Sequence, residues 1–386
     1  MRKITEKQMC SGCYACYNIC PKRCIDMQID SEGFWYPFID EEQCVDCGLC
    51  KNVCPVLNEY KGKKGQAYAC INKDENILMK SSSGGVFTLI AEMILDMEGV
   101  VFGAAFDDDL NVCHTEVKSK AELYKIRGSK YLQSNIGDTY KKAKLYLEDN
   151  REVLFTGTPC QISGLKAFLG KEYDNLTTQD IICHGVPSPR VWQQYLEYLS
   201  KTRGSAVDKK NLPAFRLKQS GWLNYSVKIS FNNGENHIQH FADDLYMQAF
   251  LKDLCLRESC YNCHSKAIER ESDITLADFW GVENVIPEMF DDKGVSLVLV
   301  SSPKGQKIFE AISDKMVYKA VDIDEAAKYN PAAYKSCERN KKRDEFMSKI
   351  TAGKFNKIVN KCTKQNLLKG YLGKIKRIIR KVINNV

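Results

Sequence analysis

The chain has 386 residues, a net charge of +7 and 18 cysteines, and this length is enough for two or three domains. The first 20 residues contain no apolar stretch with a cleavage site, so we expect a cytoplasmic protein whose cysteines are metal ligands rather than disulfides. No window reaches the roughly 18 apolar residues that a membrane span needs. Residues 335–386 hold 16 Lys/Arg against 3 Asp/Glu, so the rest of the chain is acidic and no nucleic-acid partner is expected.

The first element in chain order is a repeated cysteine motif. Cys-x2-Cys-x2-Cys-x3-Cys-Pro begins at Cys10 and recurs 34 residues later at Cys44. Such a loop brings three thiolates to one [4Fe-4S] cluster, and in two-cluster ferredoxins the fourth thiolate comes from the other motif. We therefore expect two clusters, the first bound by Cys10, Cys13, Cys16 and Cys54 and the second by Cys44, Cys47, Cys50 and Cys20. Two zinc knuckles are the alternative, but they need Cys-x2-Cys pairs rather than runs of four.

The segments that follow alternate between strand and helix patterns. Residues 33–40 are aromatic and extended, as in a short hairpin beside the clusters, and residues 59–65 are a polar linker. The next segments are predicted strands at 67–71, 99–106 and 152–156, and predicted helices at 84–97, 136–147 and 161–169. This alternation is typical of an α/β layer structure.

The second half of the chain mixes the two patterns. Residues 215–241 favour strands with a hairpin turn at 232–234, residues 243–254 favour a helix, and residues 295–300 favour a buried strand. The predicted fold class is α+β, with a two-[4Fe-4S] ferredoxin fold followed by a larger mixed α/β domain. Residues 365–386 form a basic amphipathic pattern, which predicts a helix that either contacts an anionic membrane surface peripherally or packs on the domain.

Four cysteines of the large domain are candidates for a third metal site. Cys160 opens a predicted helix after a strand, Cys183 ends another strand, and Cys260 and Cys263 form a Cys-x2-Cys pair. A small buried thiol explains each single cysteine equally well. The nearest competitor as a ligand is Cys255, and the cysteines that fit no ligand spacing, expected to be core or surface thiols, are Cys24, Cys70, Cys113, Cys337 and Cys362. His184, next to Cys183, is expected to support the ligand loop or simply to be packed, and a role in proton handling is the alternative.

Six motifs in order resemble the coenzyme F420 hydrogenase/dehydrogenase beta-subunit family, in the branch with a ferredoxin domain in front. The resemblance covers about residues 1–335, and its motifs begin at Ser81, Arg127, Thr156, Cys183, Arg257 and Ser272. The resemblance implies an FAD in the large domain. It also implies a third [4Fe-4S] cluster beside the flavin, bound by Cys160, Cys183, Cys260 and Cys263.

Two segments are the predicted flavin contacts, namely Ser83, Gly84 and Gly85, and Gly128, Ser129, Lys130 and Tyr131. The first segment precedes a helix, where glycines and a hydroxyl suit a pyrophosphate, although an ordinary helix cap has the same composition. The second offers a cation and an aromatic face, although a polar loop is the alternative. No Gly-x-Gly-x-x-Gly follows an early strand, so a Rossmann-type site has no support.

The sequence as a whole predicts an iron-sulfur flavoprotein oxidoreductase. We expect a ferredoxin domain at 1–60, a flavin and iron-sulfur domain at 66–335, and a basic tail at 336–386. Electrons would pass between the flavin and an external carrier or redox partner protein. The family resemblance implies the deazaflavin coenzyme F420 as a candidate cosubstrate and polysaccharide biosynthesis as a candidate pathway. The alternative is a non-catalytic electron-transfer subunit of a larger complex. No catalytic residue can be named.

Overall fold

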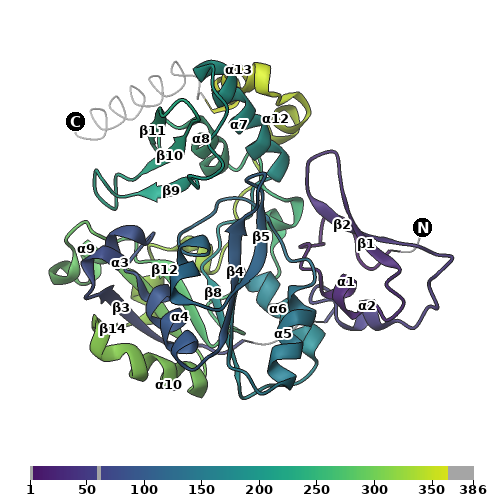
Figure 1. Cartoon of the computed structure of the whole chain (residues 1–386), viewed down its shortest axis with the longest axis vertical. Coiled ribbons are helices and arrows are strands. Elements are labelled where there is room, and N and C mark those ends of the chain that lie inside the picture. The colour runs from purple at the N-terminus through teal and green to yellow at the C-terminus, as the bar shows by residue number, and fades with distance from the viewer. Residues whose placement is uncertain (1–2, 59–61, 364–386) are drawn as a thin grey trace, which may run out of the picture.

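The computed structural model describes residues 3–58 and 62–363, which form three parts (Figure 1). The ferredoxin unit, residues 3–58, lies at one side. A nine-stranded mixed sheet with helices on both faces, the large sheet, forms the centre. A smaller layer of helices and a three-stranded sheet lies above it and is called the upper layer.

The ferredoxin unit is a hairpin with two single-turn helices. Its elements are α1 (Ala15–Ile19), β1 (Ile25–Ile29), β2 (Trp35–Ile39) and α2 (Leu49–Asn52). The predicted extended segment 33–40 contains β2, but its partner strand is β1, which the sequence pattern did not reveal. Both helices are short because each lies within a cysteine loop, and each follows a residue in the left-handed conformation.

The large sheet has four neighbouring parallel strands at its centre, β12, β8, β7 and β4. In spatial order its strands are β14 (Met316–Val321), β3 (Gln66–Asn72), β13 (Ser296–Val300), β12 (Ile274–Asp278), β8 (Leu176–Ile181), β7 (Val153–Thr156), β4 (Val100–Phe106), β5 (Val112–Val117) and β6 (Ser134–Asn135). The predicted strands at 67–71, 99–106, 152–156 and 295–300 are confirmed. Their apolar runs are continuous because helices cover both faces of the sheet.

Alternate residues of each central strand face different helices. On one face Val101 and Leu154 pack beneath α4 (Val86–Asp96) and α10 (Pro303–Ile312). On the other face Phe102 and Phe155 pack beneath α5 (Thr139–Glu148) and α6 (Pro159–Leu169). Trp35 and other residues of the ferredoxin unit join this second core, so the unit lies against the α5–α6 face (Figure 1).

The upper layer encloses the largest core. Its elements are α7 (Pro189–Arg203), β9 (Ala214–Leu217), β10 (Ser226–Ser230), β11 (Asn236–His240), α8 (Leu245–Leu251), α12 (Arg343–Lys349) and α13 (Phe355–Thr363). The predicted turn at 232–234 joins β10 to β11. Part of the predicted basic tail packs here, since Phe346 and Phe355 are buried in the same core as Trp192. The predicted amphipathic helix at 365–386 lies outside the described residues.

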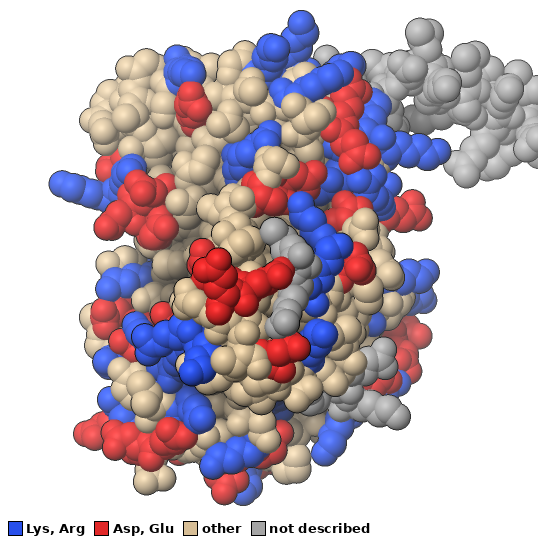
Figure 2. Space-filling model, turned by 90° about the vertical axis from the view of Figure 1, so that its right-hand side faces the viewer, with Lys and Arg blue, Asp and Glu red and all other residues tan. Residues whose placement is uncertain are grey.

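The remaining short helices are α3 (Glu75–Lys80), α9 (Val282–Val285) and α11 (Ile323–Ala327). Within the described part of the chain, no helix is long and apolar enough to cross a membrane. The face on which the ferredoxin unit lies carries acidic and basic side chains intermingled (Figure 2).

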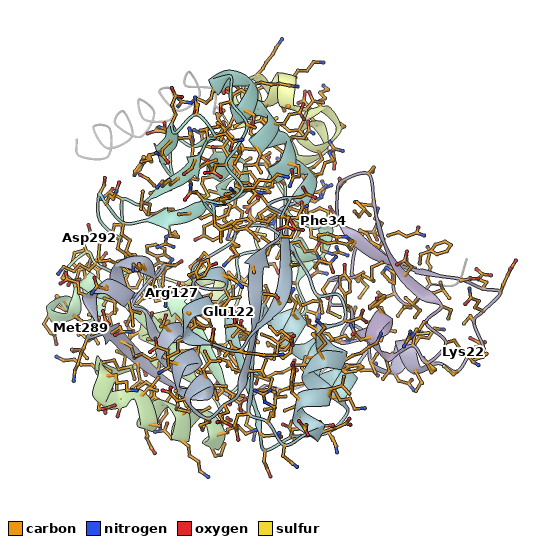
Figure 3. All side chains as sticks on the ribbon, in the orientation of Figure 1. Lys22, Phe34, Glu122, Arg127, Met289 and Asp292 are labelled. Atoms are coloured by element: carbon orange, nitrogen blue, oxygen red, sulfur yellow. The ribbon has the colours of Figure 1, made fainter. Side chains whose placement is uncertain are left out.

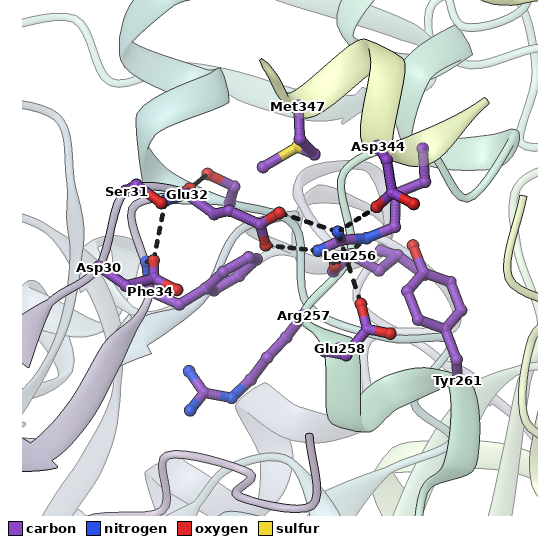
Figure 4. A network of polar contacts seen from close by, with 12 residues as sticks. Asp30, Ser31, Glu32, Phe34, Leu256, Arg257, Glu258, Tyr261, Asp344 and Met347 are labelled. Atoms are coloured by element: carbon purple, nitrogen blue, oxygen red, sulfur yellow. Dashed lines mark hydrogen bonds and ion pairs between the residues drawn. The ribbon is translucent and has the colours of Figure 1, made fainter. Parts of the chain in front are cut away.

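The tip of the β1–β2 hairpin is fixed to the upper layer by a buried ion pair (Figure 4). Arg343, only 1% exposed, donates two hydrogen bonds of 2.9 and 2.6 Å to the carboxylate of Glu32. Ser188 donates to the Glu32 carbonyl. Gly33 has φ +90°, and a Cβ atom there would lie 2.5 Å from the Cβ of Arg190, so only glycine allows this close approach. The neighbouring Phe34 is fully buried at this junction (Figure 3).

Candidate iron-sulfur and flavin sites

Two of the candidate cysteines lie at the carboxyl ends of neighbouring parallel strands. Thr156 ends β7, and Thr158 and Gln161 form a capping box that starts α6 and places Cys160 in its first turn. The adjacent strand β8 ends at Ile181, two residues before Cys183. Because the carboxyl ends of parallel strands meet at the same edge of a sheet, these two thiols come together.

The Cys260–Cys263 pair reaches the same place from the upper layer. Cys260 lies on the 3-10 helix at Glu258–Asn262 and Cys263 directly follows it. The backbone N–H of Val186 donates to the sulfur of Cys260 at 3.4 Å. The four cysteines line one cavity, which we call the third thiol site: Cys160, Cys183, Cys260 and Cys263. Cys255, the competitor named above, is fully buried in the core of the upper layer and does not line this cavity.

The spacing of these sulfur atoms is too wide for one metal ion. Around a single zinc ion, thiolates at Zn–S distances of about 2.3 Å lie only about 3.8 Å apart. In the described part of the chain, ligand atoms of three or more Cys, His, Asp or Glu residues lie within 4.8 Å of one another in one group, which is His184, Asp253 and Cys337. The sulfur atoms of the third thiol site do not form such a group. The third thiol site therefore fits the corners of a larger cluster better than it fits zinc, as do the ferredoxin cysteines.

The third thiol site also contains hydrogen-bond donors that need an acceptor. Arg270 is 4% exposed, and its Nε and Nη2 atoms have no partner among the described residues. The buried hydroxyl of Ser265 is likewise unpaired within this part of the chain. Both residues line the cavity, and the nearest acid to Arg270 is Asp180 at 3.8 Å. Sulfide and thiolate atoms of a cluster would satisfy these donors.

The electrostatics of the site oppose free thiolates but favour bound ones. Burial raises the pKa of Cys183 to about 11, while the positive charges of Lys266 and Arg270 act in the opposite direction. Burial and the three neighbouring thiols raise the pKa of Cys160. Ionised thiols at this depth need a cationic partner, which the iron of a cluster would supply.

The structure brings the ferredoxin cysteines together in the crossed sets that the sequence predicts. Burial raises the pKa of Cys16, and the charges that raise it further come from Cys13, Cys10 and Cys54, so these four lie together. The other set lines a second cavity and consists of Cys20, Cys44, Cys47 and Cys50.

Cys24 is a fifth thiol beside the second set, where the sequence predicted only a core or surface thiol. It is buried, and its sulfur lies 3.4 Å from that of Cys20. Burial opposes ionisation of Cys20, but hydrogen bonds from the backbone and thiol of Cys24 and from the backbone of Lys22 and Arg23 outweigh it and lower the pKa of Cys20. Burial and this hydrogen bond raise the pKa of Cys24 to about 12. Of the two, Cys20 is the better thiolate ligand.

The third thiol site and the first ferredoxin set are neighbours. Ser11, between Cys10 and Cys13, lines the cavity of the third thiol site. Gly164, one turn after Cys160 on α6, faces Cys13, and a Cβ there would lie 3.1 Å from the Cys13 sulfur. The second set is at the outer end of the unit, where Figure 3 shows Lys22, one of the residues around its cavity. The three thiol sites thus lie in the order third, first, second.

The first predicted flavin segment is engaged with the protein itself. Ser83 donates to the carbonyl of Val295 at 2.8 Å, and the N–H of Gly84 donates to Ser296 at 2.9 Å. A Cβ on Gly84 would lie 2.2 Å from the Cys70 carbonyl oxygen, so the glycine allows α4 to approach the sheet. Gly85 caps α4 in the left-handed conformation.

The second predicted flavin segment lies beside the first and leaves a cation without a carboxylate partner. Ser129 donates to the hydroxyl of Ser82 from its N–H and its Oγ, at 2.8 and 3.0 Å. In the described structure the ammonium of Lys130 contacts only the carbonyls of Arg127 and Gly128, both at 3.2 Å. Burial lowers the pKa of Lys130 to about 7. These groups fit an anionic ligand such as a phosphate.

Tyr131 completes the second segment with an aromatic ring. The ring stacks on Phe250 with a centroid distance of 5.0 Å, and its hydroxyl accepts a hydrogen bond of 3.2 Å from Arg216. Arg216 in turn donates two hydrogen bonds to Asp278, at 2.8 and 3.0 Å.

The chain matches the models of two known protein families. The coenzyme F420 hydrogenase/dehydrogenase beta-subunit models match residues 67–139 with the N-terminal model and 150–326 with the C-terminal one, and a 4Fe-4S dicluster model matches residues 9–58. The chain belongs to this beta-subunit family. The predicted family is therefore confirmed, and the N-terminal unit is a [4Fe-4S] dicluster domain.

A solved structure gives a further comparison. The chain is similar to a chain from a xenon-derivatised F420-reducing [NiFe] hydrogenase complex of Methanosarcina barkeri, with 19% identity and a TM-score of 0.48. The similarity covers 72% of this chain and 91% of that chain. A comparison with curated proteins gave no match.

Within the part that matches the beta-subunit family, the sequence marked Arg257 only as the start of a motif and did not predict its contacts. Arg257 is fully buried and donates to the Cys10 carbonyl at 2.7 Å and to the Trp35 carbonyl at 3.0 Å. Its guanidinium lies 4.0 Å from the ring centre of Tyr36. Arg257 is three residues before Cys260, so it ties the first ferredoxin set to the third thiol site. Figure 4 shows it pointing away from the Arg343 network. The sequence signal for Arg257 was its place at the start of the motif that contains the cysteine pair.

Proposed function

We propose that this family member is an iron-sulfur flavoprotein oxidoreductase that transfers electrons between an FAD in its large domain and an external carrier. The observation that supports this most is the contact between the third thiol site and the first ferredoxin set through α6 and Arg257. When bound, the flavin supplies two-electron chemistry and the [4Fe-4S] clusters supply one-electron transfer.

The proposed ligands of the third cluster are Cys160, Cys183, Cys260 and Cys263, in addition to the eight ferredoxin cysteines. Arg270 and Ser265 would donate hydrogen bonds to its sulfur atoms, and Lys266 fixes the loop by donating to the carbonyls of Cys183 and Ala332. Positive charge beside a cluster favours its reduced form. The proposed role of Arg270 is therefore to raise the reduction potential.

The proposed flavin contacts are the two neighbouring segments, Ser83, Gly84 and Gly85 with Gly128, Ser129, Lys130 and Tyr131. Lys130 would pair with a phosphate, since it has no carboxylate partner in the described structure. The external carrier or partner protein would dock at the outer end of the ferredoxin unit, where Cys47 is exposed. The proposed domains are 1–60 and 66–335, followed by a basic C-terminal segment at 336–386.

Cofactor content tests this proposal. Anaerobic purification is expected to give about 12 iron atoms and one flavin per chain. About eight iron atoms without flavin would instead identify an electron-transfer subunit with an empty flavin site. Zinc without a visible chromophore would contradict both functions. Bleaching of the cluster absorbance by reduced deazaflavin, reduced ferredoxin or NADH, added in turn, would identify the electron donor.

The pH dependence of flavin binding is expected to depend on Lys130. Its lowered pKa of about 7 means that the free protein is charged at this position below pH 7. A bound phosphate stabilises the charged form, so affinity should be full below pH 7 and weaken as the pH rises above it. Lys130→Met should weaken binding about 10- to 100-fold, because a hydrogen bond to a charged group contributes about 1.5–3 kcal/mol.

Fluorescence titration of the deflavinated protein between pH 6 and 9 measures this effect. Lys142→Met, at an exposed position on α5, is the matched control and should bind like the wild type. If Lys130→Met and the wild type bind the flavin with the same affinity and the same pH profile, Lys130 does not contact the flavin.

A further inference from the structure

Three side chains converge beside the third thiol site, although they are distant in the sequence. The Nε2 of His184 lies 2.6 Å from an oxygen of Asp253, and the sulfur of Cys337 completes a group whose three ligand atoms lie within 4.8 Å of one another. They come from the loop after β8, the turn after α8, and the segment between Pro331–Ala333 and α12. The sequence reasoning treated His184 as packed and Cys337 as an ordinary thiol.

The chemistry of these ligands suits a zinc-class cation. Imidazole, carboxylate and thiolate are the three ligand types of zinc sites, and adjacent ligand atoms around a tetrahedral ion lie about 3.3–3.8 Å apart. The Nε2 of His184 lies 2.6 Å from the Asp253 oxygen and all three ligand atoms lie within 4.8 Å of one another, so small side-chain movements would bring them to this spacing. The side chains of His184 and Asp253 are 39% and 21% exposed, so solvent can enter and occupy a fourth position.

The surrounding contacts hold the three residues in place. Tyr261 donates a hydrogen bond of 2.6 Å to the carbonyl of Asp253, whose φ of +56° fixes the turn after α8. The thiol of Cys337 lies 3.6 Å from the carbonyl oxygen of Cys260. The hydroxyl of Ser336 accepts a hydrogen bond of 2.9 Å from the N–H of Cys263. Ser336 and Cys337 therefore contact the backbone of both members of the cysteine pair.

We propose that His184, Asp253 and Cys337 bind one divalent cation of the zinc class, which fastens the Ser336–Cys337 segment over the third thiol site. A His184–Asp253 ion pair alone would not join these three segments. The cation would tie Cys337 to the loops that carry Cys183 and Cys260, and so limit the access of oxygen to a cluster there. This site goes beyond the proposed function and does not depend on a flavin.

Metal analysis of the anaerobically purified full chain, supplied with Zn²⁺ and then passed through a weak chelating column, tests the proposal. We expect one zinc per chain in addition to the iron. Cys337→Ser and Asp253→Asn should each lose this zinc and keep their iron. Cys362→Ser removes a buried thiol of α13 and should retain the zinc, as the matched control. With Co²⁺ in place of zinc, a sulfur-to-cobalt charge-transfer band should appear in the wild type and be lost in Cys337→Ser.

The outcomes distinguish this inference from the proposed function. Absence of excess zinc in the wild type, or equal zinc in the wild type and in both variants, would overturn it. Loss of about four iron atoms in Cys337→Ser would also overturn it, because Cys337 would then be a cluster ligand. A wild type with about eight iron atoms and one zinc, with the zinc lost in Cys337→Ser and Asp253→Asn, would contradict the third cluster while supporting the zinc site. In air, the visible absorbance of both zinc-free variants should bleach several-fold faster than that of Cys362→Ser.

Discussion

Cys160→Ala is expected to lower the iron content from about 12 to about eight atoms per chain, because a [4Fe-4S] cluster needs a ligand at each corner. The ferredoxin cysteines do not change, so the signals of two clusters should remain in electron paramagnetic resonance spectra. Since the third thiol site contacts the first ferredoxin set, the variant should also lose most of the rate with which a reduced flavin reduces the ferredoxin unit. Iron analysis and stopped-flow absorbance measure the two effects.

Cys255→Ala is the matched control for this experiment. Cys255 is fully buried in the upper layer, close in sequence to Cys260 but outside the cavity. This variant should keep about 12 iron atoms. Its free energy of unfolding should fall only slightly, because the side chain that is removed is small. The opposite result, with iron lost in Cys255→Ala and retained in Cys160→Ala, would make Cys255 the ligand.

Arg257→Met is expected to destabilise the junction between the ferredoxin unit and the large domain. The substitution leaves two buried carbonyls, those of Cys10 and Trp35, without their donor. Each unpaired buried group costs about 1–3 kcal/mol, so the free energy of unfolding should fall by about 2–6 kcal/mol. Urea denaturation followed by the visible cluster absorbance measures this loss. The spin coupling between neighbouring reduced clusters should weaken as well, because Arg257 sets the position of the Cys10 loop.

Arg339→Met provides the comparison, since Arg339 lies in the same region with its side chain 37% exposed. Arg339 pairs with Glu258 and Asp344 near the surface, so its loss should cost less than about 1 kcal/mol. If the free energy of unfolding falls by the same small amount in both arginine variants and the spin coupling is unchanged, Arg257 does not position the Cys10 loop.

The features of the fold that could be predicted from the sequence are those that depend on residues a few positions apart in the chain. The spacing from Cys10 to Cys20 lets a short loop place its thiols around one cluster, so the ferredoxin domain could be recognised without its structure. Buried strands such as β4 and β7 were evident from continuous apolar runs. The 15-residue helix α7 was missed, although Ser188, Pro189 and Gly204 are typical start and stop signals and its buried residues Trp192, Tyr195, Leu196 and Leu199 repeat at helical spacing.

The sequence by itself determined the two cysteine motifs and the alternation of strands and helices, since both are set by interactions among residues a few positions apart. Only the tertiary structure decided that the third thiol site contacts the first ferredoxin set, that Cys24 lies against Cys20, and that Cys337 meets His184. These contacts depend on the order of strands in the large sheet and on how the upper layer closes over it. Local periodicity does not encode that order, because a strand has the same pattern wherever it lies in a sheet.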